Sequence, residues 1–198
     1  MTPCRTDSDS AGALNLGLNT GGGGLNDTIV VYIDSVSGGY TDTVSFNDDA
    51  DNHRRAISAP GTGADRSDIT FASGFAADYA IAMNGTFAGL WQLNSGGANS
   101  LTYIATLSQD PAAGASTMEW SAITLAQIGI TPGSSFRYVV TYLNGGNAYR
   151  SDEFHGVAQS TVPGGNIGQA PVTLAAGDWN TFISYAAPTP TPNATETS

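Results

Sequence analysis

The hydrophobic positions of this chain fall into short runs that are separated by turns rich in glycine and asparagine. The strongest run, residues 29–33 (Ile-Val-Val-Tyr-Ile), places five residues that favour β structure in succession. It predicts a strand that is buried on at least one face, and Gly38 and Gly39 beyond it predict a turn. We expect this run to form the central strand of a sheet.

Other runs predict further strands, and no crossover helices lie between them. The expected strands are residues 13–18, 42–46, 55–58, 68–71, 77–83, 86–93, 101–107, 117–123, 135–143 and 178–185. One helical turn is expected at 124–129, with Gly129 as its C-cap, and Asn84-Gly85 indicates a hairpin. Because parallel sheets need crossover helices, the pattern predicts an all-β protein, an antiparallel β-sandwich of jelly-roll or immunoglobulin-like type.

Changes in composition mark the ends of the expected domain. Residues 1–12 are polar and are expected to form a flexible leader, followed by a single β-sandwich domain at 13–186. Residues 187–198 are rich in threonine and proline and predict an extended linker to a following domain. The single cysteine, Cys4, lies in the leader, so no internal disulfide is expected.

The charge balance narrows the range of partners. The 198 residues include 17 acidic residues and six basic ones, all arginine, which gives a net charge of −11. Such a chain is repelled by phosphate backbones and anionic membrane surfaces, so we expect no nucleic-acid binding. No apolar run is long enough to cross a bilayer, so no membrane insertion is expected. Abundant glycine with few charges is typical of exported bacterial modules and predicts a secreted or cell-surface location.

Several strand-and-turn motifs resemble those of one group of accessory modules. The motifs are Leu14-Asn15-Leu16-Gly17-Leu18, the segment 26–39 (NDTIVVYIDSVSGG), Ala77-Asp78-Tyr79-Ala80-Ile81-Ala82 and Ala88-Gly89-Leu90-Trp91-Gln92-Leu93. Together they resemble the family 9 carbohydrate-binding and DOMON-like β-sandwiches of secreted bacterial proteins, over about residues 13–185. The resemblance implies a β-sandwich fold and an accessory role in binding carbohydrate.

A calcium site is predicted where oxygen-bearing side chains are densest. The four side chains of this predicted site are Asn47, Asp48, Asp49 and Asp51. Calcium prefers oxygen ligands, although these residues lack the spacing of an EF-hand loop. The alternative interpretation is a solvated acidic turn. Asp34, at the end of the central strand, is a second candidate ligand, or else accepts hydrogen bonds from the amides that follow it in an Asx-turn.

A ligand groove is predicted in the loop expected at residues 148–156. The five side chains expected to line it are Tyr149, Arg150, Asp152, Glu153 and His155. Rings of this kind stack on sugar faces, and acids accept hydrogen bonds from sugar hydroxyls. The alternative is an ordered loop held by an ion pair between Arg150 and Asp152 or Glu153.

Three tryptophans are distributed over the expected strands. Trp120, which lies beside Glu119, is the one of the three expected to be nearest the surface, and both are included in the predicted ligand site; core packing is the alternative for Trp120. Trp91 and Trp179 are expected in the core. Asp78, inside a strand, is expected either to face solvent or to pair with an arginine, because a lone buried carboxylate is costly.

The chain offers little catalytic chemistry. It has two histidines and no Gly-x-Ser-x-Gly motif, so we expect no enzyme activity. The expected function is that of an accessory module of an exported multidomain protein that binds a polysaccharide or cell-surface glycan as a monomer within a longer chain. The alternative is a structural or adhesive spacer without a small-molecule ligand. A hydrolase would need two carboxylates facing each other across a cleft.

Overall fold

The computed structural model describes residues 5–8, 12–19, 25, 27–59, 67–110, 117–144, 149–158, 161–162 and 167–184. Its strands are β1 (Arg5–Ser8), β2 (Ala13–Asn19), β3 (Thr28–Asp34), β4 (Ile69–Thr70), β5 (Tyr79–Met83), β6 (Ala88–Gln92), β7 (Thr102–Thr106), β8 (Ser108–Asp110), β9 (Thr117–Thr124), β10 (Ser135–Leu143), β11 (Arg150–His155), β12 (Val172–Thr173) and β13 (Asn180–Ile183). The helices are α1 (Asn52–Ser58) and a 3-10 helix (Leu125–Ile128). The predicted all-β fold is confirmed.

The largest sheet is antiparallel and contains the strongest hydrophobic run near its centre. Its strand order is β11-β10-β3-β5-β6-β7, and β13 pairs with β10 as well. β3 pairs along its whole length with β10, from Asp34 opposite Arg137 to Thr28 opposite Leu143. On its other side β3 pairs with β5. The expectation that this run forms a central strand is therefore confirmed.

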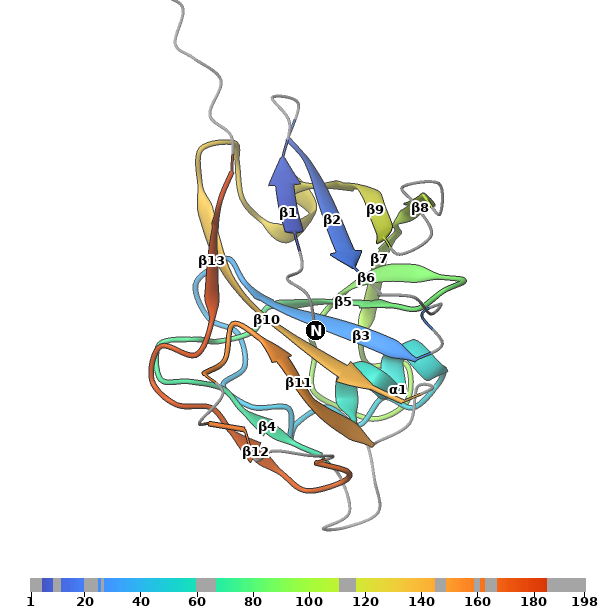
Figure 1. Ribbon diagram of the computed structural model, residues 1–198, viewed down its shortest axis with the longest axis vertical. Coiled ribbons are helices and arrows are strands. Elements are labelled where there is room, and N and C mark those ends of the chain that lie inside the picture. Colours follow the sequence, from blue (N-terminus) through green and yellow to red (C-terminus); the bar gives the residue numbers. More distant parts are fainter. Residues whose placement is uncertain are drawn as a thin grey trace, which may run out of the picture.

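A four-stranded sheet, in the order β1-β2-β9-β8, covers one face of this central sheet (Figure 1). Alternate residues of β3, namely Ile29, Val31 and Ile33, belong to the same buried cluster as Leu16 of β2 and Ile123 of β9. This contact between two sheets makes the β-sandwich.

The other face of the central sheet is also buried. Val30 and Tyr32 of β3 belong to a second cluster, which includes Ile57 of α1. The Tyr32 hydroxyl donates a 2.6 Å hydrogen bond to the Ile57 carbonyl. In Figure 1, α1 and the small parallel pair β4–β12 lie on the side away from β1 and β2. Because both faces of β3 are covered, its run is hydrophobic at every position rather than at alternate ones.

Four local expectations are corrected by the structure. Arg5–Ser8, expected within a flexible leader, form β1 and pair with β2. Residues 55–58 are helical, because Asp51 caps the start of α1 by accepting hydrogen bonds from two amides. The stretch 42–46 makes only isolated bridges. The expected loop at 148–156 contains strand β11, which pairs with β10.

The turn after β3 is held by a carboxylate that is distant in sequence. The Oδ2 atom of Asp78 accepts hydrogen bonds from the amides of Ser35 (2.9 Å) and Val36 (3.0 Å). Asp78 is therefore buried and binds backbone amides, rather than facing solvent or pairing with an arginine as expected. It accepts the hydrogen bonds from the turn that were expected to go to Asp34. Asp34 instead lies 3.7 Å from the guanidinium of Arg137, and burial raises the pKa of Asp34.

The predicted helical turn is confirmed as the 3-10 helix at 125–128. The hydroxyl of Thr124 accepts a hydrogen bond from the amide of Gln127, and the Gln127 side chain accepts one from the amide of Thr124. Gly129 ends the helix with φ of 77°, a left-handed conformation that favours glycine.

Candidate functional site

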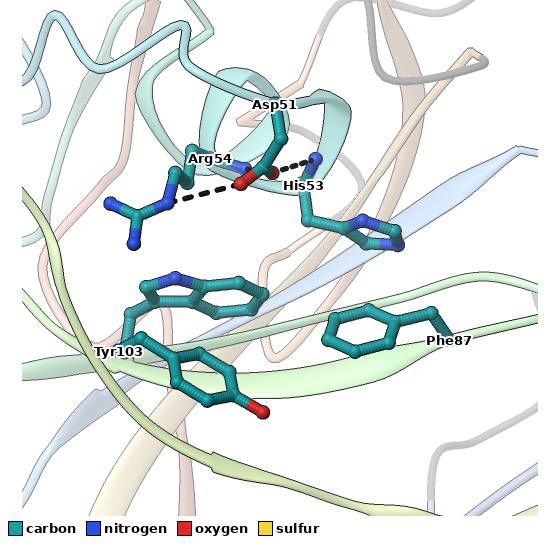
Figure 2. A pocket seen from close by; sticks show the side chains of 6 residues that line it. Asp51, His53, Arg54, Phe87 and Tyr103 are labelled. Atoms are coloured by element: carbon teal, nitrogen blue, oxygen red, sulfur yellow. Dashed lines mark hydrogen bonds and ion pairs between the residues drawn. The ribbon is translucent and has the colours of Figure 1, made fainter. Parts of the chain in front are cut away.

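A pocket of about 420 Å³ lies between α1 and the β6–β7 end of the central sheet. It is lined by Asp51, His53, Arg54, Phe87, Trp91 and Tyr103. Figure 2 shows Asp51 and Arg54 on one side of the pocket, with Phe87 and Tyr103 on the other. The pocket thus has a polar side that comes from the start of α1 and an aromatic side that comes from the sheet.

The aromatic side depends on the pairing of β6 with β7. Trp91 lies directly opposite Tyr103, and the rings meet edge to face with centroids 5.6 Å apart. An irregularity in the pairing puts Ala105 opposite Leu90, so Tyr103 and Ala105 oppose adjacent residues of β6. Adjacent strand residues point to opposite faces, so the irregularity directs Tyr103 to the same face as Trp91. Trp91 is 2% exposed, and Tyr103, at 43%, is the accessible ring.

Phe87 and His53 continue the aromatic side. Their rings meet edge to face with centroids 4.8 Å apart. Phe87 is positioned by the turn between β5 and β6, where the side-chain oxygen of Asn84 accepts hydrogen bonds from the amides of Thr86 and Phe87. The predicted Asn84-Gly85 signal for a hairpin is confirmed by the pairing of Met83 with Ala88.

The polar side is a network of two carboxylates and one guanidinium. Asp51 Oδ1 accepts hydrogen bonds from the amides of His53 and Arg54, both at 2.9 Å, and Asp51 Oδ2 lies 3.0 Å from Arg54 Nε. Arg54 Nη1 donates to Asp48 Oδ2 at 2.7 Å and to the Leu101 carbonyl at 2.6 Å. The guanidinium is therefore held in one place, and its charge is shared by two acids.

Asp48 anchors this network from beneath the surface. Its Oδ1 accepts hydrogen bonds from the amides of Ala50 and Asn99, and its Oδ2 accepts one from the amide of Leu101. Burial by itself raises the pKa of Asp48, but the hydrogen bonds from Arg54 and from these amides outweigh it and hold the pKa below its ordinary value. Asp48 is thus an ionised carboxylate that ties the start of α1 to the turn before β7.

Two nitrogen atoms that belong to residues lining the pocket are buried without a partner among the described residues. They are Nε1 of Trp91 and Nε2 of His53. Burial lowers the pKa of His53, and nearby Asp51 and a hydrogen bond with Asn84 act in the opposite direction. The ring is therefore neutral at pH 7.

The residues of the predicted calcium site occupy different environments. Asn47 and Asp49 are exposed, Asp48 is buried in the network above, and Asp51 lines the pocket. In the described part of the chain, no group of three or more His, Cys, Asp or Glu side chains is placed to hold a metal ion. Calcium binding stays a prediction, and Asp51 is the member of this set that belongs to the pocket.

The second predicted group lies on β11, at the opposite edge of the central sheet from β7. Arg150 is fully buried there, and its guanidinium donates to the Ser67 hydroxyl (2.9 Å), the Ser67 carbonyl (3.0 Å) and the Thr141 hydroxyl (2.7 Å). The expectation that Arg150 lines a groove is therefore wrong. Its long side chain is part of the protein interior.

The other members of that group are more accessible. Tyr149 is 46% exposed, Glu153 is exposed, and Asp152 is half-buried. His155 is half-buried beside Tyr138, with ring centroids 6.1 Å apart. The Arg150 guanidinium does not join them at the surface, because it points into the core, toward Ser67 and Thr141.

Two of the three tryptophans, Trp91 and Trp120, are buried, and Trp179 is half-buried. Trp120 is 1% exposed, because β9 pairs with β2 and brings Trp120 opposite Leu16 in the core. The prediction that Trp120 belongs to a surface ligand site is therefore wrong and the alternative of core packing holds, although its neighbour Glu119 is exposed. The expected burial of Trp91 is confirmed. Trp179 is half-buried, with the Arg137 guanidinium 4.9 Å from its ring centroid.

Comparison with protein-family models, with curated proteins and with solved structures finds no match to this chain. Among the described residues, no helix has the length and apolar character needed to cross a membrane. The function of this chain must therefore be inferred from the pocket itself.

Acidification is expected to destabilise the domain in two stages. Burial lowers the pKa of His53 below 6.5, so the unfolded chain takes up a proton more readily and the free energy of unfolding falls as the pH drops below about 6.5. The pKa values of Asp48 and Asp178 are below 3.8, because hydrogen bonds outweigh the effect of burial. Their stabilisation is present above that pH and is lost as the pH falls through their lower folded values.

Urea unfolding between about pH 8 and pH 3 measures both stages. The pKa of Asp34 is raised, so its protonation on acidification stabilises the fold, whereas protonation of Asp48 and Asp178 destabilises it. The second stage therefore measures the difference between these two effects on the free energy of unfolding. The variant His53→Gln should reduce the slope of the first stage. Equal stability of the wild-type protein at about pH 7.5 and pH 5.5 would contradict the expected first stage.

Proposed function

We propose that the domain binds carbohydrate in the pocket between α1 and the β6–β7 edge, as a non-catalytic accessory module of an exported multidomain protein. The observation that carries the proposal is the exposed ring of Tyr103, supported edge to face by Trp91 within a pocket that is also lined by Asp51. Such an aromatic surface beside a carboxylate suits a sugar, which has an apolar C–H face and a rim of hydroxyl groups.

Each part of a sugar has a partner in this arrangement. The C–H face packs on the Tyr103 ring, whose hydroxyl is hydrogen-bonded to that of Thr106. A hydroxyl donates to the carboxylate of Asp51, whose side chain is 49% exposed. A volume of about 420 Å³ is within the range of small-molecule sites, about 300–1,000 Å³.

The chemistry of the pocket supports binding rather than glycoside hydrolysis. A hydrolase needs one carboxylate on each side of the scissile bond. Asp51 is the carboxylate among the residues that line the pocket, and it lies on the same side as Arg54. Asp48, the nearest further acid of the network, is buried and engaged by Arg54 and backbone amides.

Removal of the Tyr103 ring tests the proposal. We expect Tyr103→Ala to weaken glycan binding by about tenfold, because the loss of a stacking surface corresponds to about 1.4 kcal/mol. Folding should be little affected, because the ring is 43% exposed. Isothermal titration against a panel of soluble oligosaccharides, with and without calcium, measures the affinity and also tests the predicted calcium site.

A matched control is present at the opposite edge of the sheet. Tyr149 is exposed to a similar extent, 46%, so Tyr149→Ala should bind as the wild-type protein does. If Tyr149→Ala loses affinity and Tyr103→Ala does not, the ligand site lies on β11 and the pocket is the wrong place. If the wild-type protein binds no glycan in the panel, the proposal is wrong, and the structural or adhesive spacer becomes the preferred function.

A further inference from the structure

We infer that the pocket selects sugars that carry a free ammonium group over neutral and acidic sugars. This inference rests on the proposed function, since it names the class of glycan that the same pocket would bind. It follows from the balance of charge in the network of Asp48, Asp51 and Arg54 and from the rings that face this network.

The network of Asp48, Asp51 and Arg54 beside the pocket carries a surplus of one negative charge. Arg54 contributes one positive charge, and Asp48 and Asp51 contribute two negative ones. His53 is neutral at pH 7, because burial lowers its pKa. Among the described residues that line the pocket, Arg54 is the one fixed cation. The chain as a whole carries −11, which adds to the attraction of a cation.

Arg54 is poorly placed to receive an acidic sugar. Its Nε and Nη1 atoms are taken up by Asp51, Asp48 and the Leu101 carbonyl, and its side chain is 14% exposed. A uronic acid or a sulfated sugar would bring a second anion against Asp51, and two of the three guanidinium nitrogens of Arg54 are already engaged. Asp51 is more accessible, with its side chain 49% exposed. The charge that the pocket presents to a ligand is therefore that of a carboxylate.

The aromatic side of the pocket favours the same class of ligand. A cation within about 6 Å of the face of a tryptophan, tyrosine or phenylalanine ring is attracted by its quadrupole. Opposite the carboxylate, Tyr103 supplies an accessible ring and Phe87 a half-buried one, and Trp91 packs against both. An ammonium group on a sugar ring can thus donate to Asp51 and lie against an aromatic ring, whereas a hydroxyl gains much less from either contact.

Three β-1,4-linked tetramers of the same ring geometry test this selection, because they differ only at C2. Tetramers of glucosamine, N-acetylglucosamine and glucose carry an ammonium, an acetamide and a hydroxyl group there, and tetragalacturonate serves as the acidic probe. At about pH 6.5 a substantial share of the glucosamine amines is protonated, while His53, whose pKa lies below 6.5, stays mostly neutral. We expect the glucosamine tetramer to bind about tenfold more tightly than the other two and tetragalacturonate to bind most weakly. The preference should decrease as salt is added.

The variant Asp51→Asn tests the contribution of the negative charge without disturbing the fold. Asparagine is also a good N-cap, so α1 is retained while the surplus negative charge is removed. We expect the preference for glucosamine to fall to about twofold or less in this variant. The control is Asp49→Asn, which removes an exposed acid that does not line the pocket and should leave the preference unchanged.

The possible outcomes separate the two proposals. If the glucose and glucosamine tetramers bind equally well, or if Asp51→Asn retains the full preference, the inference about ammonium sugars is wrong and the proposal of carbohydrate binding stands. If none of the tetramers binds, and the wider glycan panel gives no binding either, the proposed function itself is wrong.

Discussion

Asp48→Ala is expected to lower the free energy of unfolding by about 3 kcal/mol or more. The carboxylate is buried and accepts hydrogen bonds from Arg54 and from the amides of Ala50, Asn99 and Leu101. Without it, three amides lose their partner and Arg54 keeps only Asp51 to balance its charge. The loss should also disorder the polar side of the pocket, so ligand binding falls together with stability.

Urea unfolding measures the loss of stability in Asp48→Ala, and Asp49→Ala, which removes the neighbouring acid, serves as the control. Asp49 is exposed, and its removal should change the free energy of unfolding by less than about 0.5 kcal/mol. A change of less than about 1 kcal/mol in Asp48→Ala would show that the network does not hold α1 against the turn before β7.

Arg150→Ala is expected to have an effect of similar size or larger, about 3–5 kcal/mol. The substitution removes a fully buried side chain that makes hydrogen bonds to Ser67 and Thr141. It leaves those polar groups unsatisfied and creates a cavity between β11 and the segment at residue 67. The result should be a lower urea midpoint with little change in the affinity for glycan, because β11 and β7 lie at opposite edges of the sheet.

Arg150→Lys tests whether the shape of the guanidinium matters as well as its charge. Lysine keeps the charge but cannot reproduce donors at both Nε and the terminal nitrogens, so we expect it to recover less than half of the loss. Arg137→Ala is the exposed control. Its side chain is 44% exposed and lies over Trp179, and its removal should cost about 1 kcal/mol or less. Full stability in Arg150→Lys would show that charge alone suffices at this position.

The sequence predicts the strands of this fold well because hydrophobic periodicity reports burial. The run at 29–33 and the run at 135–143 appear as β3 and β10, the central pair of the large sheet. The helix α1 was predicted as a strand over its last residues, since it is only seven residues long and has too few turns to show a helical period. Its signal in the sequence was Asp51, a residue type typical of N-caps, directly before Asn52.

The pocket could not be predicted because it depends on pairing between distant residues. Trp91 and Trp120 both lie in strands and both are buried, and nothing local shows that Trp91 lines a pocket while Trp120 packs between the two sheets. Tyr103 reaches the pocket through an irregularity in the pairing of β6 with β7. Likewise, Asp34 and Asp78 look alike in sequence, and only the fold shows which of them binds the amides at 35 and 36.

The pairing of β3 with β10 sets the order in which a newly made chain can fold. Residues that pair across these strands lie about a hundred positions apart, so β3 must wait until the ribosome has produced β10. During that interval the most hydrophobic strand of the protein has an unpaired edge, which can recruit the same strand of another chain. Acidic residues outnumber arginines in the part of the chain that precedes β10 as well, so incomplete chains repel one another, and this repulsion opposes such association.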